Sequence, residues 1–283
     1  MLKQKVMALG AHADDIEVMF GGTLLKCKDQ GYGIVYIMTT NNMSGANSVL
    51  QPDGAIKSTM DGPVITMRRR KSECDAACEV LGTKAIHLDH PQRHYYSPQD
   101  GRSCELRYGC KLPEGVKPDV PSILTAYEDK ASVARLVDLI LEHNPACILS
   151  HGMADQNIEH VGSALLATTA FWEAVDKGYR GAFLHSVGHY SRFGDSNFKW
   201  DTFVDISDYL DAKMALLGKH RCQMPTAHYP DHGHRLLSMR KGVSAGCKAA
   251  DLYTWVRRFD IPDQDTTEHT YNPLIAELIC NTR

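Results

Sequence analysis

The chain lacks both the glycine-rich loops that bind nucleotides and the long apolar runs that cross membranes. It contains no G-x-G-x-x-G, no Walker loop and no G-x-S-x-G elbow, so neither a dinucleotide site nor a serine nucleophile is predicted. The apolar stretch at 6–11 is too short for a signal-peptide core or a membrane span. We therefore expect a cytoplasmic protein without a membrane span.

A strong excess of one charge is also absent. The formal net charge is −3, which argues against a nucleic-acid partner, because binding to phosphate backbones depends on clustered positive charge. Nine cysteines, an odd number without a C-x-x-C pair, predict reduced thiols rather than a disulfide framework. The 283 residues, 43% of them hydrophobic, are enough for one large α/β domain over 1–283.

Apolar runs alternate with amphipathic stretches along most of the chain, a pattern typical of βαβ units. Strands are predicted at 4–10, 33–40, 84–88, 145–150, 182–190 and 202–206. Helices are predicted at 16–29, 64–81, 129–143, 158–177, at 207–220 with Ser207 as its cap, and at 245–256. These elements predict a Rossmann-like, mostly parallel sheet flanked by helices on both faces.

Two stretches break this pattern. Residues 91–128 contain five prolines and no clear periodicity, so we expect a loop insertion there. It either covers or lines the site or is a polar surface excursion. Residues 41–60, which follow a predicted strand, are expected to form another wall of the same crevice.

Histidines and carboxylates follow two of the predicted strands. His12, Asp14 and Asp15 come after 4–10, and the segment from His151 to His160 comes after 145–150. If both strands are parallel and close, His12, Asp15 and His160 converge, and this set leaves a fourth zinc position for water. The same ligands suit Fe2+, Mn, Co or Ni. Alternatively, the aspartates are helix caps and His160 is structural.

Four motifs in order resemble the PIG-L/LmbE-like zinc-dependent N-acetylglucosaminyl de-N-acetylases. The resemblance covers about two-thirds of the chain. The first motif is A-H-A-D-D-I-E followed by G-G-T-L over 11–24. The second is R-x-x-E at 70–73, within the helix predicted at 64–81. The third is D-Q-N-I-E-H at 155–160, and the last is D-I-S-D at 205–208 with Lys213 and H-R-C-Q at 220–223.

The resemblance implies that His12, Asp15 and His160 bind zinc and that Asp14 is the general base. A zinc-activated water would then remove an acyl group, most simply acetyl, from an amino sugar or its conjugate. It also implies a small-molecule partner, while homo-oligomerisation stays open. Arg70 is expected either to bind substrate or to pair with Glu73 three residues on.

This chain departs from the family pattern at three positions. Ala13 replaces a proline and Glu159 an aspartate. Asn157 replaces a histidine that is thought to stabilise the oxyanion, and its neutral amide can only donate a hydrogen bond. His151 and His220, both expected to lie near the substrate, are candidates to take over that role. Two alternatives stay open. One is an amidase acting on a larger conjugate, and the other, supported only by Asn157, is a sugar-binding protein with weakened catalysis.

Overall fold

The chain folds around an eight-stranded mixed sheet in the order β12-β10-β11-β9-β8-β1-β2-β5. This computed structural model describes residues 4–96, 103–105, 121–187, 200–257 and 280–281. The strands of the sheet are β1 (Lys5–Gly10), β2 (Gly33–Thr40), β5 (Ala85–His90), β8 (Cys147–Ser150), β9 (Ala182–Ser186), β10 (Thr202–Asp205), β11 (Ala250–Arg257) and β12 (Cys280–Asn281). The expected α/β architecture is confirmed.

The five strands β9-β8-β1-β2-β5 are parallel, and the direction of the strand order changes at β1. The chain runs outward from β1 through β2 to β5, then returns to place β8 on the other side of β1. In open α/β sheets ligands bind beyond the carboxyl ends of the strands at such a switch point. The residues that follow β1 and β8 therefore share the position where a site is expected.

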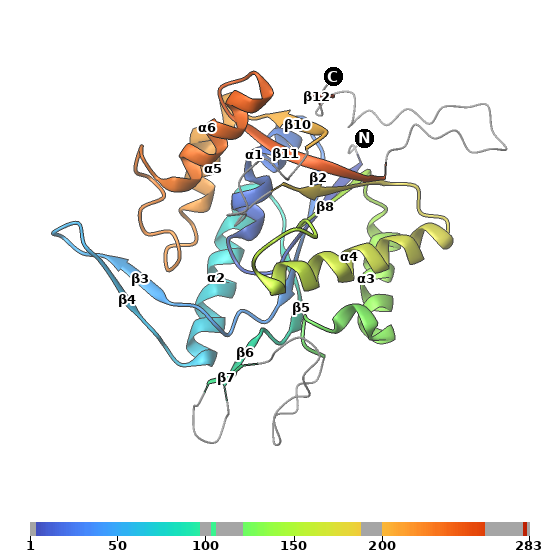
Figure 1. Ribbon diagram of the computed structural model, residues 1–283, viewed down its shortest axis with the longest axis horizontal. Coiled ribbons are helices and arrows are strands. Elements are labelled where there is room, and N and C mark those ends of the chain that lie inside the picture. The colour runs from blue at the N-terminus through green and yellow to red at the C-terminus, as the bar shows by residue number, and fades with distance from the viewer. Residues whose placement is uncertain (1–3, 97–102, 106–120, 188–199, 258–279, 282–283) are drawn as a thin grey trace.

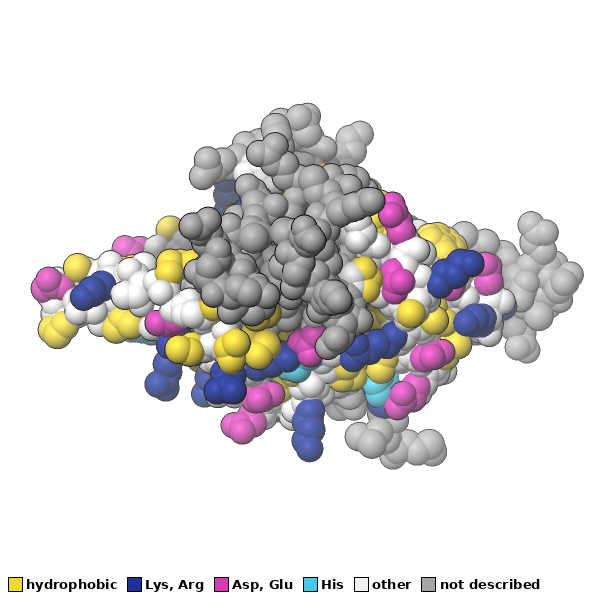
Figure 2. All heavy atoms as spheres, turned by 90° about the horizontal axis from the view of Figure 1, so that it is seen from below, with side chains coloured by type: hydrophobic (Ala, Val, Ile, Leu, Met, Phe, Trp, Pro, Cys, Tyr) yellow, Lys and Arg dark blue, Asp and Glu magenta, His cyan; other side chains and the backbone are white. Residues whose placement is uncertain are grey.

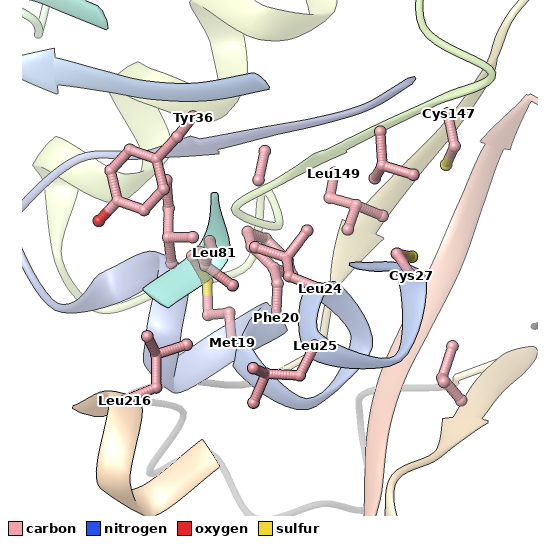
Figure 3. Packing of buried hydrophobic residues seen from close by; sticks show 14 of the residues in the cluster. Met19, Phe20, Leu24, Leu25, Cys27, Tyr36, Leu81, Cys147, Leu149 and Leu216 are labelled. Carbon is pink, nitrogen blue, oxygen red and sulfur yellow. The ribbon is translucent and has the colours of Figure 1, made fainter. Parts of the chain in front are cut away.

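Helices cover both faces of the sheet (Figure 1). The helices are α1 (Asp15–Asp29), α2 (Pro63–Leu81), α3 (Lys130–His143), α4 (Ile158–Asp176), α5 (Leu210–Leu217) and α6 (Gly233–Ala245), with short 3-10 turns η1 (Ala126–Glu128) and η2 (Ser207–Tyr209). Alternate residues of the strands enter two separate apolar cores. One core lies against α1, α2 and α5 (Figure 3), and the other lies against α3 and α4.

The G-G-T segment of the first motif packs α1 onto the C-terminal part of the fold. A Cβ at Gly22 would come within 2.6 Å of Ile206. The Thr23 hydroxyl lies 3.0 Å from a carboxylate oxygen of Asp251 on β11. This half of the motif therefore serves packing, while its first half lies at the switch point.

The prediction of a helix at 245–256 is wrong. The helix of this region, α6, ends at Ala245 and is capped by Gly246, which has a φ of 78°. Residues 250–257 form β11 between β9 and β10. Glycine stops the helix at this left-handed position, and the aromatic and β-branched residues of 250–257 favour a strand. Ser207 does not cap a helix either, because its hydroxyl donates to Asp205 at 2.5 Å.

Both stretches that break the pattern contain short hairpins. Strands β3 (Asn47–Leu50) and β4 (Ile56–Thr59) pair antiparallel and project from the body (Figure 1). Strands β6 (His94–Tyr96) and β7 (Ser103–Glu105) pair within 91–128, of which 97–102 and 106–120 lie outside the described residues.

On the described part of the face around β6 and β7, basic and acidic side chains are interspersed (Figure 2). No helix in the described ranges is long and apolar enough to span a membrane.

Candidate metal centre

Two imidazoles and one carboxylate converge at the switch point between β1 and β8. The Nδ1 atom of His12 lies 3.2 Å from Nε2 of His160. Asp15 Oδ2 lies 3.2 Å from His12 Nδ1 and 3.4 Å from His160 Nε2. All three residues are buried and form a potential metal-binding group. The structure therefore brings together the three residues that the sequence predicts as ligands.

The spacing of these three atoms fits a tetrahedral metal ion. Ligands at about 2.0–2.1 Å from a tetrahedral zinc are about 3.3–3.4 Å apart, which is close to the separations observed. The atoms are also farther apart than a strong N–H···O hydrogen bond of about 2.9 Å. The donor set and its spacing therefore suit a tetrahedral metal site.

A second carboxylate holds each of the two imidazoles from its other side. Asp155 Oδ2 lies 3.0 Å from His160 Nδ1, and Glu159 contacts His12 Nε2. Burial lowers the pKa of both histidines, but the carboxylates outweigh it and raise the pKa of His12 to about 8 and that of His160 to about 10. Carboxylates placed in this way fix the tautomer of a metal-binding histidine and raise its basicity.

Asp15 is held in its charged form although it is buried. Burial opposes its ionisation, yet the imidazoles of His160, His151 and His12 outweigh burial and keep the pKa of Asp15 well below its usual range. The backbone N–H of His12 also donates to Oδ2 at 2.7 Å. A carboxylate that is ionised throughout the physiological range is a suitable metal ligand.

Asp14 lies beside the metal ligands and faces the cavity. Its backbone has a φ of 103°, and its side chain makes no capping hydrogen bond to α1, so helix capping does not explain this carboxylate. Burial raises the pKa of Asp14 to about 6, and Arg70 opposes the increase. Arg70 Nη2 lies 3.6 Å from Asp14 Oδ1. The geometry provides a carboxylate that can exchange a proton near neutral pH.

Arg70 points into the site rather than toward Glu73. Its two terminal nitrogens donate to the carbonyl oxygens of Ser44 at 2.9 Å and Ala13 at 2.7 Å. Glu73 instead accepts from the backbone N–H of Cys222 at 2.9 Å. The guanidinium is therefore held rigidly next to Asp14 and lines the cavity.

Asn157 caps the helix that carries His160. Its Oδ1 accepts from the backbone N–H of Glu159 at 3.0 Å, and the residue also lines the cavity. Because the oxygen is used by the cap, the side-chain NH2 group is the part that can serve a ligand. Asn157 therefore presents a neutral hydrogen-bond donor to the cavity.

The two other predicted histidines lie behind the cavity wall. His151 Nε2 accepts from the backbone N–H of Ala11 at 2.9 Å, and its ring stacks on His160 with centroids 4.1 Å apart. His220 lies 2.9 Å from Glu17, and neither side chain of this pair is exposed. Neither histidine lines the cavity. The structure thus places both beside the metal centre but not among the residues that face a ligand.

The cavity has a volume of about 310 Å³. Besides the residues already described, its lining contains Ser44, Gly45, Gln92, Arg93 and Gln223. Ser44 and Gly45 belong to 41–60, the stretch predicted to form a wall of the crevice, and Gln92 and Arg93 begin 91–128, the stretch predicted to cover or line it. The sequence did not single out any of the five as an individual site residue, although Gln92 and Arg93 follow the carboxyl end of β5, where ligands are expected. A larger cavity, of about 650 Å³, lies between β3, α2 and α5 and contains none of the predicted site residues.

Comparison with known proteins identifies the family. The model of the PIG-L family, described as GlcNAc-PI de-N-acetylase, matches residues 7–171. The chain belongs to this family. The matched range contains all three potential ligands together with Asp14, Arg70 and Asn157.

Individual relatives share 25% sequence identity or less with this chain. The diacetylchitobiose deacetylase of Thermococcus kodakarensis is 25% identical over 228 residues, which cover 78% of this chain and 71% of that protein. The solved N,N'-diacetylchitobiose deacetylase of Pyrococcus horikoshii has a TM-score of 0.63 at 17% identity and covers 89% of this chain and 84% of its own. The 4-carboxy-2-hydroxymuconate hydratase of Pseudomonas putida KT2440 has a TM-score of 0.64 at 19% identity, with coverages of 90% and 97%.

Proposed function

We propose that this protein is a metal-dependent hydrolase that removes an N-acetyl group from an amino sugar or its conjugate. The observation that carries the proposal is the arrangement of Asp14 beside three metal-ligand atoms at tetrahedral spacing. Membership in the PIG-L family and the deacetylase activity named for the relatives support it. We propose zinc as the metal, with Fe2+ as the main alternative for this donor set.

His12, Asp15 and His160 would hold the ion. When bound, a divalent ion supplies Lewis acidity, which lowers the pKa of water and polarises a carbonyl. Asp14 is the residue that accepts a proton from the attacking water and returns it to the departing amine. Arg70 keeps Asp14 ionised before the reaction, because its positive charge opposes the effect of burial.

Asn157 is proposed to donate its NH2 group to the developing oxyanion. A fixed donor at that position stabilises the negative charge that forms on the carbonyl oxygen. A neutral amide contributes less than a charged imidazolium, so we expect a lower rate than in an enzyme with histidine there.

The test is product analysis on a panel of N-acetylated amino sugars. The zinc-loaded protein is incubated with each compound, and acetate and free amine are measured separately. Equal amounts of acetate and amine from one or more compounds would support the proposal. Release of amine together with a larger acid would indicate the amidase alternative, and binding without any product would indicate a sugar-binding protein.

A second candidate is addition of water to a carbon–carbon double bond. One observation favours including it: a hydratase shares the fold along nearly its whole length. Hydration raises substrate mass by one water and releases no acetate. Mass spectrometry of the protein with unsaturated carboxylic acids therefore separates this candidate from the hydrolase.

A further inference from the structure

One buried histidine, His151, contacts the metal centre from behind and has no role in the proposed hydrolysis. It comes directly after β8, is fully buried and lies outside all four sequence motifs. Its side chain does not line the cavity, so it does not face a substrate. Any part that it plays in the reaction is therefore exerted through the residues that it contacts.

The side chain of His151 joins β1 and β8 where their backbones no longer pair. The two strands pair in parallel register as far as Ala8 and Leu149. Beyond that point, the backbone N–H of Ala11 donates to Nε2 of His151 at 2.9 Å. The imidazole thus takes the place of a further backbone partner, and it holds the residue just before the first metal ligand.

The same ring packs against the ligands that come from the two helices. It stacks on His160 of α4, with ring centroids 4.1 Å apart and planes inclined by 21°. Its Nε2 also lies 3.2 Å from Oδ2 of Asp15, at the start of α1. On the cavity side, Glu159 of α4 contacts His12. His151 supplies the corresponding link between these elements on the buried side.

The contacts of His151 are poorly suited to stability alone. A backbone N–H can only donate, so Nε2, which faces Ala11 at the shorter distance, is the unprotonated nitrogen, and the proton of the neutral ring lies on Nδ1. In the part of the chain that the structure describes, Nδ1 is buried without a hydrogen-bond partner. Burial of such a group costs free energy. An imidazole at this position therefore indicates a requirement beyond packing.

We propose that His151 is a positioning residue of the metal centre. By accepting from the N–H of Ala11 while its ring rests on His160, it sets the distance between the ligands of β1 and α1 and the ligand of α4. A frame that exists before an ion binds lowers the cost of assembling the site. This inference rests on the metal site of the proposed function but not on its substrate.

Two substitutions separate the acceptor from the ring. His151→Phe keeps a flat ring but removes the acceptor, whereas His151→Gln keeps an acceptor near the position of Nε2 and removes the ring. His185→Phe is the matched control. His185 is half-buried on β9, is paired with the last residue of β8, and contacts Thr168 and Phe183.

The test measures metal binding and metal geometry on the full chain. Competition with a chelator gives the zinc affinity, and the visible absorption bands of the Co2+ form report the coordination geometry. Urea denaturation of the chelated protein gives the stability of each variant without metal. Neither metal readout depends on the identity of the substrate.

We expect His151→Phe to bind zinc about 10- to 100-fold more weakly than the wild type and to shift the visible bands of Co2+. The reason is that the segment before His12 loses its link to β8. His151→Gln should bind zinc more tightly than His151→Phe, because it restores an acceptor. His185→Phe should stay within about twofold of the wild-type affinity.

Wild-type affinity and an unchanged Co2+ spectrum in His151→Phe would overturn the proposal, even if urea unfolds this variant more easily, because a purely structural residue affects unfolding alone. Equal losses of affinity in His151→Phe and His151→Gln would overturn it as well, since the acceptor would then not be the cause. If His151→Phe does not fold, His151→Leu replaces it under the same criteria.

Failure of the proposed function gives a different result. Metal binding with the expected pattern among the variants but without acetate release would refute the hydrolase and leave the role of His151 intact. A wild-type protein that binds no metal would refute both.

Discussion

Two clusters of buried charge lie along α1, and they differ in how completely their members are paired. In the first, Lys213 Nζ lies 2.5 Å from one oxygen of Asp251, and Thr23 donates to the other oxygen from its N–H and its hydroxyl. Tyr253 completes the cluster through the Thr23 hydroxyl at 2.5 Å. Both oxygens of Asp251 are thus satisfied by protein groups, as in a structural ion pair.

The second cluster, at the N-terminus of α1, is arranged differently. Here Asp15 lies 3.2 and 3.4 Å from imidazole nitrogens of His12 and His160, separations that suit one shared metal ion, and Asp14 makes no helix cap. A fully paired cluster fixes the fold, whereas a cluster whose donor atoms share a centre is arranged for an added ion. Substitutions in either cluster therefore test this difference.

The largest expected effect is that of Asp14→Asn. The amide cannot accept a proton, so kcat should fall by about 10²- to 10⁴-fold. The metal content, measured by elemental analysis, should stay at the wild-type value because Asp14 is not among the three proposed ligands. Loss of the metal in this variant would assign Asp14 to the ion rather than to proton transfer.

Lys213→Met should break the paired cluster. It leaves Asp251 buried without its cation, which is expected to cost about 3–5 kcal/mol of unfolding free energy. Urea denaturation measures the loss, with Lys219→Met as the control at an exposed lysine. The zinc affinity of the folded variant should be unchanged, and a change in affinity would show that the two clusters are coupled.

Metal binding should depend strongly on pH. In the metal-free protein the pKa values of His12 and His160 are raised to about 8 and about 10, so both are protonated at pH 7 and each must lose a proton to bind an ion. Affinity therefore rises with pH, by about 2.7 kcal/mol per pH unit below 8 if two protons leave. Calorimetry in buffers of different ionisation enthalpy counts the protons. Binding without proton release would contradict the assignment of these ligands.

Asp155→Asn should weaken metal binding without removing it. The carboxylate orients His160 and raises its basicity, and loss of such a partner typically costs about 10- to 100-fold in metal affinity. A competition titration with a chelator measures the change. An unchanged affinity would mean that packing alone orients His160.

The smallest expected effect is a gain from Asn157→His. A charged donor in place of the amide should raise kcat by about fivefold, which corresponds to about 1 kcal/mol. The same change removes the cap of α4 and should lower the unfolding free energy by about 1 kcal/mol. A lower kcat in a folded variant would instead show that the amide itself is needed.

The local sequence pattern predicted the parallel core, and it predicted the convergence of His12, Asp15 and His160 on the condition that the strands before them are parallel and close. Strong apolar runs define β1 and β8, and parallel strands necessarily present their carboxyl ends together. The error at 245–256 arose because the position of β11 depends on pairing with β9 and β10, which are distant in the sequence. The burial of His151 and His220 behind the cavity wall also depends on tertiary packing, which the local sequence does not reveal.

We propose that this cavity hydrolyses an amide only when its metal position is filled. The direct measurement is a zinc titration of the chelated protein, in which acetate release and metal content are determined on the same samples. The account predicts a rate that rises in proportion to bound zinc and reaches its maximum at one ion per chain. A rate that does not depend on metal content would contradict it.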